Sequence, residues 1–309
     1  MTRDALLASL DRPVRVGIGA SEEPPMPVIT VFTPDEVENK ENPAPLSDFN
    51  RQFLAQGDSW FSLGALPLKS SNLFDGMSTD IAACAVNFAS PGAVLKRMVD
   101  ATRERRFLSY LNGPLRQPWS ALLLSGGGND LIDAAAVGPA HPRDKRLLAT
   151  RDEWGQGIAE DRFLSNAGWS TFSVYLEAVV KQMLQERDRN VNRSIPVVLH
   201  TYDLAVPRPS GVGFGKGPWL QPSLVTFGVP ETEWAAVAAL MLRRLKALLF
   251  QIAATVPDGS VHVVNTQGTL TPASTRDTGP TADWVNEIHP TKAGYRKLSA
   301  LWSPVLNQL

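Results

Sequence analysis

Short apolar runs alternate with longer amphipathic stretches through most of the chain after residue 50. Apolar residues recur at helical spacing after Val94, around 176–184, after Pro230 and after Thr291. Five other runs have the length and composition of buried strands, at 52–55, 81–89, 121–124, 195–199 and 261–264. One further short run, at 28–32, has the character of an edge strand. The pattern therefore predicts strands and helices in alternation.

This alternation predicts an α/β domain with three layers, in which helices cover both faces of a mostly parallel five-stranded sheet. Right-handed crossovers then bring the C-terminal ends of the strands to one edge of the sheet. Because ligands of open α/β sheets bind along that edge, we expect the chemistry in the residues that directly follow the strands.

Three polar segments depart from the alternation. Residues 1–48 are rich in Pro, Glu, Asp and Asn, and we expect them to form an N-terminal extension of a domain that spans 49–309. Residues 134–167 and 204–229 are predicted to be loop insertions within that domain, because long irregular segments in a compact domain are commonly functional or mobile.

The insertion at 204–229 is also expected to line a substrate pocket. It follows the fourth predicted strand and therefore emerges at the functional edge. Its Phe214, Trp219 and Phe227 offer apolar surface that a solvated loop does not need. Trp60 is expected to line the same pocket. The alternative is that these aromatic side chains only hold the loop against the core.

Composition narrows the functional classes. The chain has 309 residues with 30 basic and 31 acidic side chains interspersed, which gives no indication of a nucleic-acid partner. No apolar run reaches the length of a membrane span. The single cysteine, Cys84, lies in an apolar run and is expected to be buried. The four histidines show no paired metal-ligand spacing, so we expect no metal or other cofactor.

The N-terminus makes a poor secretory signal, because charged residues interrupt its apolar stretch. We therefore expect a cytoplasmic location, with secretion by another route left open. The sequence leaves the oligomeric state open as well.

Nucleophilic serine chemistry is the best candidate activity. It needs a serine on a tight turn, a histidine to accept its proton, a group that orients the histidine, and donors for the oxyanion. Ser59 follows a predicted strand in the turn Gly57-Asp58-Ser59, although Asp58 and Ser59 are also suited to cap a helix.

Two of the three other requirements also find candidates in the chain, the oxyanion donor and the histidine. Asn129 follows three glycines at a strand end, where its amide can donate to an oxyanion and the glycines let a substrate approach the backbone. An ordinary turn asparagine is the alternative. A phosphate cradle is disfavoured because the Walker lysine is missing. His289 precedes Pro290, which favours an extended conformation that presents the imidazole.

Taken in order, these blocks resemble the SGNH (GDSL-like) hydrolases: GDSW at 57–60, NFASPG at 87–92, GGND at 127–130 and NEIHP at 286–290. The resemblance implies a flavodoxin-like SGNH fold with Ser59 as nucleophile and His289 as base. It also implies an oxyanion hole formed by the backbone N–H groups of Ser59 and Gly92 and the side chain of Asn129. No cofactor is implied.

One position departs from the family pattern. The residue three before the histidine is usually Asp, and here it is Asn286. Either this amide orients His289, or Asp283 reaches in, with Glu287 as a weaker option. The spacing favours Asn286. We favour Asp283, because a charged partner stabilises the imidazolium better than a neutral one.

These observations predict a serine esterase or lipase that acts on a small-molecule or lipid ester through an acyl-enzyme. Two alternatives remain open at this point. The same site is suited to transfer the acyl group to an alcohol, and the fold is able to persist as a binding module without turnover.

Overall fold

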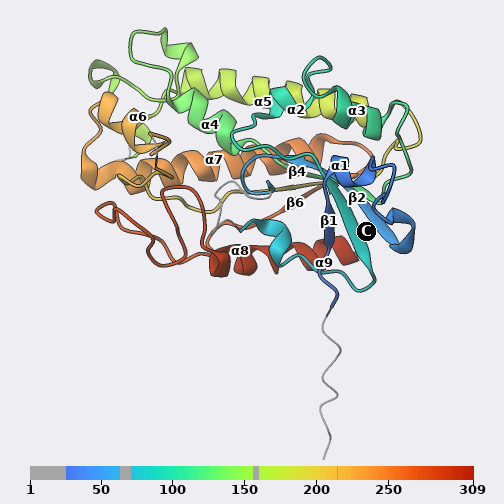
Figure 1. Cartoon of the computed structure of the whole chain (residues 1–309). Coiled ribbons are helices and arrows are strands. Elements are labelled where there is room, and N and C mark those ends of the chain that lie inside the picture. The colour runs from blue at the N-terminus through green and yellow to red at the C-terminus, as the bar shows by residue number, and fades with distance from the viewer. Residues whose placement is uncertain (1–25, 63–70, 156–159, 214) are drawn as a thin grey trace, which may run out of the picture.

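Six parallel strands form one sheet at the centre of the molecule (Figure 1). The computed structural model describes residues 26–62, 71–155, 160–213 and 215–309. The strands are β1 (Thr30–Phe32), β2 (Arg51–Gly57), β3 (Ala83–Asn87), β4 (Ala121–Ser125), β5 (Val197–His200) and β6 (Val261–Val264). Their order is β1-β3-β2-β4-β5-β6, and every neighbouring pair is parallel.

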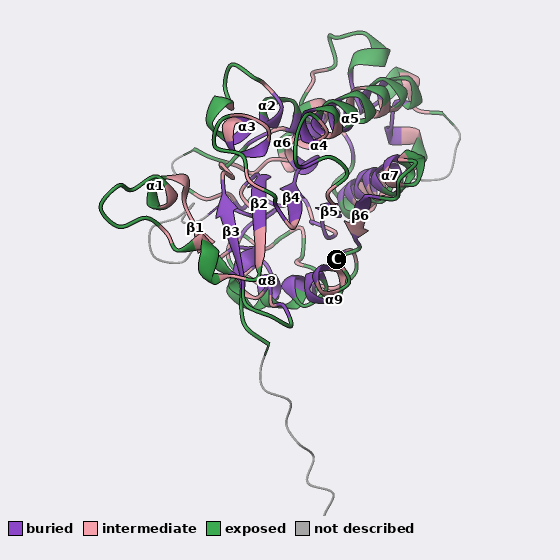
Figure 2. Cartoon of the chain, turned by 90° about the vertical axis from the view of Figure 1, so that its right-hand side faces the viewer, coloured by how far each residue is buried: buried purple, intermediate pink, exposed green. Residues whose placement is uncertain are grey.

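Helices cover both faces of this sheet, as Figure 2 shows. One face carries α2, α3, α4, α5 and α7, and the opposite face carries α8 and α9. The helices are α1 (Pro34–Val37), α2 (Leu95–Met98), α3 (Arg105–Leu111), α4 (Gly128–Ala135), α5 (Asn166–Arg187), α6 (Gln221–Thr226), α7 (Trp234–Thr255), α8 (Lys292–Ser299) and α9 (Trp302–Asn307).

The predicted fold class is confirmed, with one strand more than expected. Without β1, the order β3-β2-β4-β5-β6 corresponds to the flavodoxin-like order 2-1-3-4-5. The extra strand arises from the apolar run at 28–32, which pairs with the outer edge of β3. Strands β3 and β4 are fully buried, because both faces of the sheet are covered, and their continuous apolar sequences reflect this.

Two predicted helices are divided in the structure. The helix expected from Val94 to Thr102 ends at Met98, because the Asp100 carboxylate accepts hydrogen bonds from the backbone N–H groups of Thr102 (2.8 Å) and Arg103 (3.2 Å). Such an Asx turn competes with helical bonding. The C-terminal helix is likewise split between α8 and α9.

The N-terminal extension contributes to the sheet where it is described. Within 26–48, β1 occupies the sheet edge and a capping box between Thr33 and Glu36 begins α1. Residues 1–25 lie outside the described residues. The insertion at 134–167, where described, is built on short 3₁₀ turns, and a buried Arg146 pairs with Glu153 through two 2.6 Å hydrogen bonds.

Candidate active site

Ser59 lies in a tight turn directly after β2. The Asp58 carbonyl accepts hydrogen bonds from the backbone N–H groups of Phe61 (3.1 Å) and Ser62 (3.0 Å), and the Asp58 carboxylate accepts one from Trp60 N–H (3.0 Å). Asp58 therefore makes the capping contacts of this turn. The Ser59 side chain, which is only half-buried, is left to face the C-terminal edge of the sheet.

His289 meets Ser59 from the loop between β6 and α8. A hydrogen bond from Val285 N–H to the His289 carbonyl (2.8 Å) tightens this loop just before the helix. The imidazole Nε2 lies 2.8 Å from Ser59 Oγ, and Nδ1 lies 3.0 Å from the side-chain oxygen of Asn286. The structure thus joins Ser59, His289 and Asn286 in one line of hydrogen bonds.

The hydrogen bonds of Asn286 determine the tautomer of His289. Its Oδ1 accepts hydrogen bonds from the backbone N–H groups of Ile288 (3.1 Å) and His289 (2.9 Å), so the amide oxygen, not the nitrogen, must face this side. The same oxygen is the neighbour of His289 Nδ1, which therefore carries a hydrogen and donates it. Nε2 is then left without a hydrogen and can accept the proton of Ser59, as a general base must.

The surroundings of His289 also favour the basic form. Burial lowers the pKa of His289 to about 4, because a charged imidazolium is poorly solvated there. The neutral Asn286 amide adds no charge that would raise this pKa again. The imidazole is therefore neutral at pH 7 and ready to accept a proton.

The expectation that Asp283 orients His289 is wrong. The Asp283 carboxylate accepts hydrogen bonds from Lys297 Nζ (2.7 and 2.9 Å) and from Thr271 N–H (2.8 Å). Burial alone would raise its pKa, but Lys297 and Thr271 outweigh burial and hold the pKa of Asp283 below its ordinary value. This carboxylate is committed to fixing α8 and the loop before it.

Glu287 serves the neighbouring insertion instead of the imidazole. Its buried carboxylate accepts hydrogen bonds from the backbone N–H groups of Trp219, Leu220 (2.9 Å), Gln221 (2.8 Å) and Arg208 (3.3 Å). Burial raises its pKa, while these four donors favour the ionised form. One side chain of the histidine loop therefore holds the 204–229 segment in place.

Asn129 lies in the first turn of α4, directly after the glycines that follow β4. Its side-chain nitrogen donates one hydrogen bond to the carbonyl of Ala93 (3.1 Å), which fixes the amide and ties α4 to the turn that contains Gly92. The second N–H of the amide is available for a ligand. The roles of Ser59 N–H, Gly92 N–H and Asn129 as oxyanion donors remain proposals.

Two of the glycines before Asn129 are closely packed against side chains. A Cβ atom at Gly126 would lie 2.4 Å from Leu95 Cδ2, and one at Gly128 would lie 2.7 Å from the Tyr202 ring. Close packing by these side chains accounts for the two glycines, and Gly128 also faces a small cavity beside Ser59. The adjacent Asp130 is buried and accepts hydrogen bonds from Leu95 N–H (3.0 Å) and the Tyr175 hydroxyl (2.6 Å).

Comparisons with known proteins give structural similarity only. No family model matches the sequence, and no curated protein sequence matches it. An extracellular lipase from Streptomyces rimosus is 16% identical in sequence, with 84% of this chain and 99% of that chain covered and a TM-score of 0.43. Phospholipase A1 from Streptomyces albidoflavus NA297 is also 16% identical, with 84% of this chain and 98% of that chain covered and a TM-score of 0.45. A mutant acetyl-xylooligosaccharide esterase from Geobacillus is 13% identical, with 84% of this chain and 94% of that chain covered and a TM-score of 0.41.

The four sequence blocks now have positions in space. GDSW follows β2, NFASPG follows β3, GGND follows β4, and NEIHP precedes α8, and the first and last meet through the Ser59–His289 hydrogen bond. The chain resembles the SGNH hydrolases. It differs from the SGNH pattern in that an asparagine is hydrogen-bonded to the histidine.

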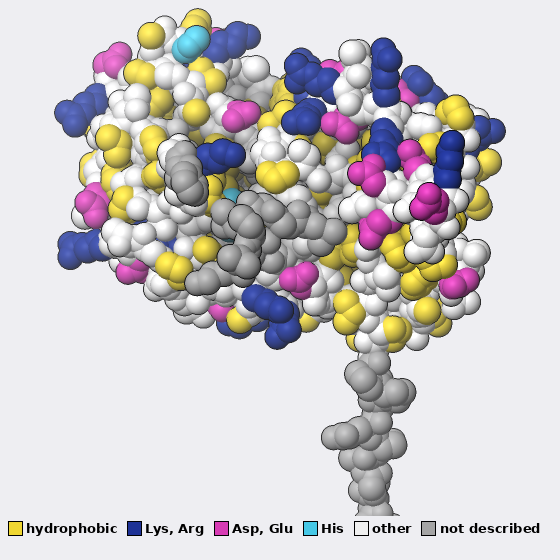
Figure 3. Space-filling model, viewed as in Figure 1, with side chains coloured by type: hydrophobic (Ala, Val, Ile, Leu, Met, Phe, Trp, Pro, Cys, Tyr) yellow, Lys and Arg dark blue, Asp and Glu magenta, His cyan; other side chains and the backbone are white. Residues whose placement is uncertain are grey.

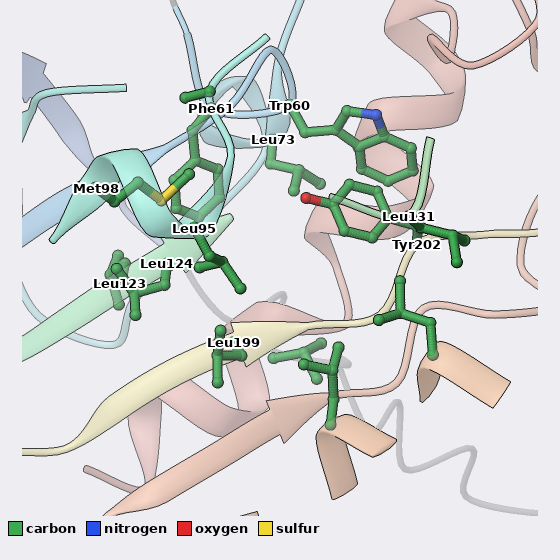
Figure 4. Close-up of a cluster of buried hydrophobic side chains, with 14 of the residues drawn as sticks. Trp60, Phe61, Leu73, Leu95, Met98, Leu123, Leu124, Leu131, Leu199 and Tyr202 are labelled. Atoms are coloured by element: carbon green, nitrogen blue, oxygen red, sulfur yellow. The ribbon is translucent and has the colours of Figure 1, made fainter. Parts of the chain in front are cut away.

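A small cavity opens beside Ser59 in this SGNH-like site. Its volume is about 30 Å³. It is lined by Asp58, Ser59, Trp60, Gly128, Asn129, Leu131, Ile132, Tyr202, Asp203, Ala205, Leu220, Leu242 and Ile288. Trp60 borders this cavity, and its role in binding a substrate stays a prediction. Its indole N–H donates to the carbonyl of Ile288 (3.2 Å), and its ring packs edge-on against Tyr202 at 4.9 Å, with Leu131 close by (Figure 4).

The insertion at 204–229 contributes to the cavity through aliphatic residues, not through the aromatic ones. Ala205 and Leu220 line it. Trp219 instead packs edge-on against the His289 ring, with centroids 5.2 Å apart. Phe227 is buried below the surface, and Phe214 lies outside the described residues. Trp219 therefore does not line this cavity but contacts the histidine, and its role in binding a substrate stays a prediction.

A second serine–histidine hydrogen bond lies beneath the site, and the sequence analysis missed it. Ser125, at the end of β4, has its Oγ 2.9 Å from Nε2 of His200, at the end of β5, and donates to the Asp58 carboxylate (2.7 Å). His200 Nδ1 faces the carbonyl of Thr201 at 2.8 Å. The Tyr202 hydroxyl also donates to Asp58. Burial raises the pKa of Asp58 to about 6 and lowers that of His200 to about 4.

Other classes of site find no support in the described part of the chain. Across 26–62, 71–155, 160–213 and 215–309, no three His, Cys, Asp or Glu side chains are grouped so as to hold a metal ion. None of the helices in these ranges combines the length and the apolar character that a membrane crossing requires. On the face seen in Figure 3, basic and acidic side chains are interspersed.

Proposed function

We propose that this protein is a serine hydrolase that cleaves carboxylic esters through an acyl-enzyme on Ser59. The observation that carries the proposal is the hydrogen-bonded line Ser59–His289–Asn286 beside an apolar cavity at the C-terminal edge of the sheet. A serine hydroxyl becomes an effective nucleophile when a neutral imidazole accepts its proton during attack. Both the distance and the tautomer of His289 suit this step.

Acylation forms one bond and breaks another. Ser59 Oγ attacks the ester carbonyl carbon while its proton passes to His289 Nε2, which gives a tetrahedral oxyanion and an imidazolium. The carbon–oxygen bond to the alcohol then breaks, and the Nε2 proton passes to the leaving oxygen. Asn286 accepts a hydrogen bond from Nδ1–H throughout, which keeps Nε2 directed at Ser59.

Deacylation repeats these steps with water. His289 Nε2 takes a proton from the water molecule as it attacks the acyl carbon, and then returns the proton to Ser59 Oγ as the carboxylic acid leaves. In both halves of the reaction, Asn129 and the backbone N–H groups of Ser59 and Gly92 are the proposed oxyanion donors. Loss of one such donor typically lowers kcat by about 10²–10³-fold.

Labelling of the active-site serine tests the proposal. A fluorophosphonate probe should label Ser59, and Ser59→Ala should lose both the label and hydrolysis of p-nitrophenyl acetate. Ser125→Ala is the matched control, because Ser125 also bonds a histidine but is fully buried. It should still be labelled at Ser59. Label found on another serine, or normal hydrolysis by Ser59→Ala, would reject the proposal.

The same assay separates hydrolysis from its alternatives. Addition of a short alcohol as acceptor shows whether the acyl group goes to water or to the alcohol. Predominant formation of a new ester would identify an acyltransferase. Binding of an ester without label or turnover would identify a non-catalytic module.

A further inference from the structure

The walls of the cavity beside Ser59 are mainly hydrocarbon. Leu131 and Ile132 project from α4 and Leu242 from α7, and Leu220 lies directly before α6. Ala205 and the Trp60 ring complete these walls. Such a lining favours an aliphatic group, because it offers no partner for a polar one.

The polar groups at the cavity are already occupied by protein partners. The Asp203 carboxylate accepts four backbone hydrogen bonds, from Leu204 (2.7 Å), Gly268 (2.7 Å), Thr269 (3.0 Å) and Leu270 (2.7 Å). The Tyr202 hydroxyl and the Asp58 carboxylate bind each other. Among the described side chains that line the cavity, only those of Ser59 and Asn129 keep polar atoms for a substrate, and both are assigned to the reacting carbonyl. A hydroxyl or amino substituent on the bound group would therefore be left without a partner.

The cavity is also short. Its volume is about 30 Å³, whereas a single water molecule needs about 10–15 Å³ of such space. It therefore has room for roughly two or three small groups in a row. Leu242 and Leu131, which are among its walls, are both buried.

The position of His289 indicates which half of the ester enters this cavity. The leaving alcohol receives its proton from Nε2 and must lie beside the imidazole. His289 is not part of the cavity lining, whereas Ser59 and the proposed oxyanion donor Asn129 are. The cavity is thus on the acyl side of the scissile bond.

We infer that this cavity binds an unsubstituted aliphatic acyl group of two to four carbons, so that the protein is an esterase for short acyl chains. The inference rests on the proposed function and adds the substrate class to it. Each methylene that the cavity covers raises kcat/KM roughly fourfold, and a methylene beyond its end gains nothing and must displace a wall side chain.

A series of p-nitrophenyl esters tests the inference, because only the acyl chain changes along it. From acetate to butyrate, kcat/KM should rise, and from butyrate to octanoate it should fall by tenfold or more. An optimum at octanoate or beyond would overturn the inference. Equal or better hydrolysis of the 3-hydroxybutyrate ester relative to butyrate would overturn it as well.

Wall variants show whether this cavity sets the limit. Leu242→Ala should lengthen the optimum by about two carbons, since truncation of a buried leucine leaves space behind. Leu249→Ala is the matched control: the same truncation on α7, also buried, at a position that does not line the cavity. It should keep the wild-type profile. Ile132→Ala, at a half-buried position, repeats the test if Leu242→Ala does not fold.

The outcomes separate this inference from the proposed function. Acetate esters of alcohols of different size should show the same ranking in the wild type and in Leu242→Ala. A change confined to this alcohol series would assign the cavity to the leaving group and overturn the inference alone. Identical acyl profiles for Leu242→Ala and Leu249→Ala would do the same. Absence of both hydrolysis and Ser59 label would reject the proposed function and the inference together.

Discussion

The molecule contains two serine–histidine hydrogen bonds of nearly equal length. Ser59 Oγ lies 2.8 Å from Nε2 of His289, and Ser125 Oγ lies 2.9 Å from Nε2 of His200. Their surroundings differ: Ser59 and His289 are half-buried and Ser59 borders the cavity, whereas both members of the second pair are 0% exposed and neither borders it. Only the first pair can meet a substrate.

The position of the carboxylate separates the pairs further. In the second pair, Asp58 binds the serine, and His200 Nδ1 faces a backbone carbonyl. Ser125 has one hydroxyl hydrogen and cannot donate it to Asp58 and to His200 at once, so the two groups compete for it. In the first pair, Ser59 Oγ is hydrogen-bonded to His289 and, among the described residues, to no second acceptor. A short serine–histidine distance therefore does not identify a nucleophile unless access and proton direction agree.

Replacement of each histidine should give the largest difference between the two pairs. His289→Ala should lower kcat by about 10⁴-fold or more, because the nucleophile loses its base. His200→Phe should keep kcat within about tenfold and lower the free energy of unfolding by about 1–3 kcal/mol, since Ser125 and Thr201 lose a buried partner. Ester hydrolysis and chemical denaturation measure the two effects. The reverse pattern would transfer the catalytic role to the buried pair.

Asn286 is the next point at which the first pair can be tested. Asn286→Ala should lower kcat by about 10²-fold, because the imidazole loses its tautomer and orientation. In Asn286→Asp, a carboxylate at the same position should preserve or raise kcat at pH 8, and should raise the pKa of His289 by about 1–3 units. Since only neutral His289 acts as base, the acid limb of the kcat/KM profile should then move to higher pH than in the wild type, where the pKa is about 4.

Asp283→Asn is the control for this series. It disturbs the contacts of Lys297 and Thr271 but not the imidazole, so kcat should stay near that of the wild type. Normal kcat in Asn286→Ala would mean that His289 does not depend on this amide.

Substitution of Glu287 tests how the 204–229 segment is held beside the first pair. Glu287→Gln should lower kcat/KM by about tenfold, because one amide oxygen cannot accept the four backbone hydrogen bonds that the carboxylate accepts. Loosening Leu220 and Trp219 should also weaken acyl-chain discrimination, which loss of global stability alone would not do. Trp219→Ala removes the ring contact with His289 and should change kcat/KM by a smaller factor, corresponding to about 0.5–1.5 kcal/mol.

The pH dependence of the unfolding free energy tests how His200 and its partner Asp58 titrate in the folded protein. The folded pKa of His200 is lowered to about 4, so stability rises with pH between about 4 and 6.5, where only the unfolded chain binds that proton. The folded pKa of Asp58 is raised to about 6, so stability falls with pH between about 4 and 6. The two contributions oppose each other in the wild type.

Removal of His200 should abolish its rising contribution and leave the opposing contribution of Asp58 in place. In His200→Phe, the slope of unfolding free energy against pH should become more negative by about 1.4 kcal/mol per pH unit between pH 4 and 6, the value for one proton. Denaturant titrations at several pH values measure this slope. An unchanged slope would show that His200 does not titrate as its burial implies.

The sequence predicted the elements that carry the site better than the contacts inside it. Strand ends at 57, 125 and 264 follow from short apolar runs, and the parallel sheet brings those ends to one edge. The division of the helix after Met98 depends on one carboxylate, Asp100, which takes over two backbone donors. Apolar spacing does not contain this information.

The choice between Asp283 and Asn286 shows a second limit. Charge favoured Asp283, but Lys297, in the last turn of α8, donates hydrogen bonds to that carboxylate. This encounter depends on the path of the loop before α8. The Ser125–His200 contact could have been predicted from the sequence, since both residues end adjacent parallel strands. Its burial, which decides its role, was not.

The edge strand β1 bears on how the protein behaves in concentrated solution. Without it, β3 would present its outer row of backbone N–H and C=O groups to other molecules, and an open strand edge is a template for aggregation. β1 covers that row with only three residues, and Pro34 follows closely. A version of the chain shortened to begin after Phe32 should therefore keep its catalytic groups and lose colloidal stability.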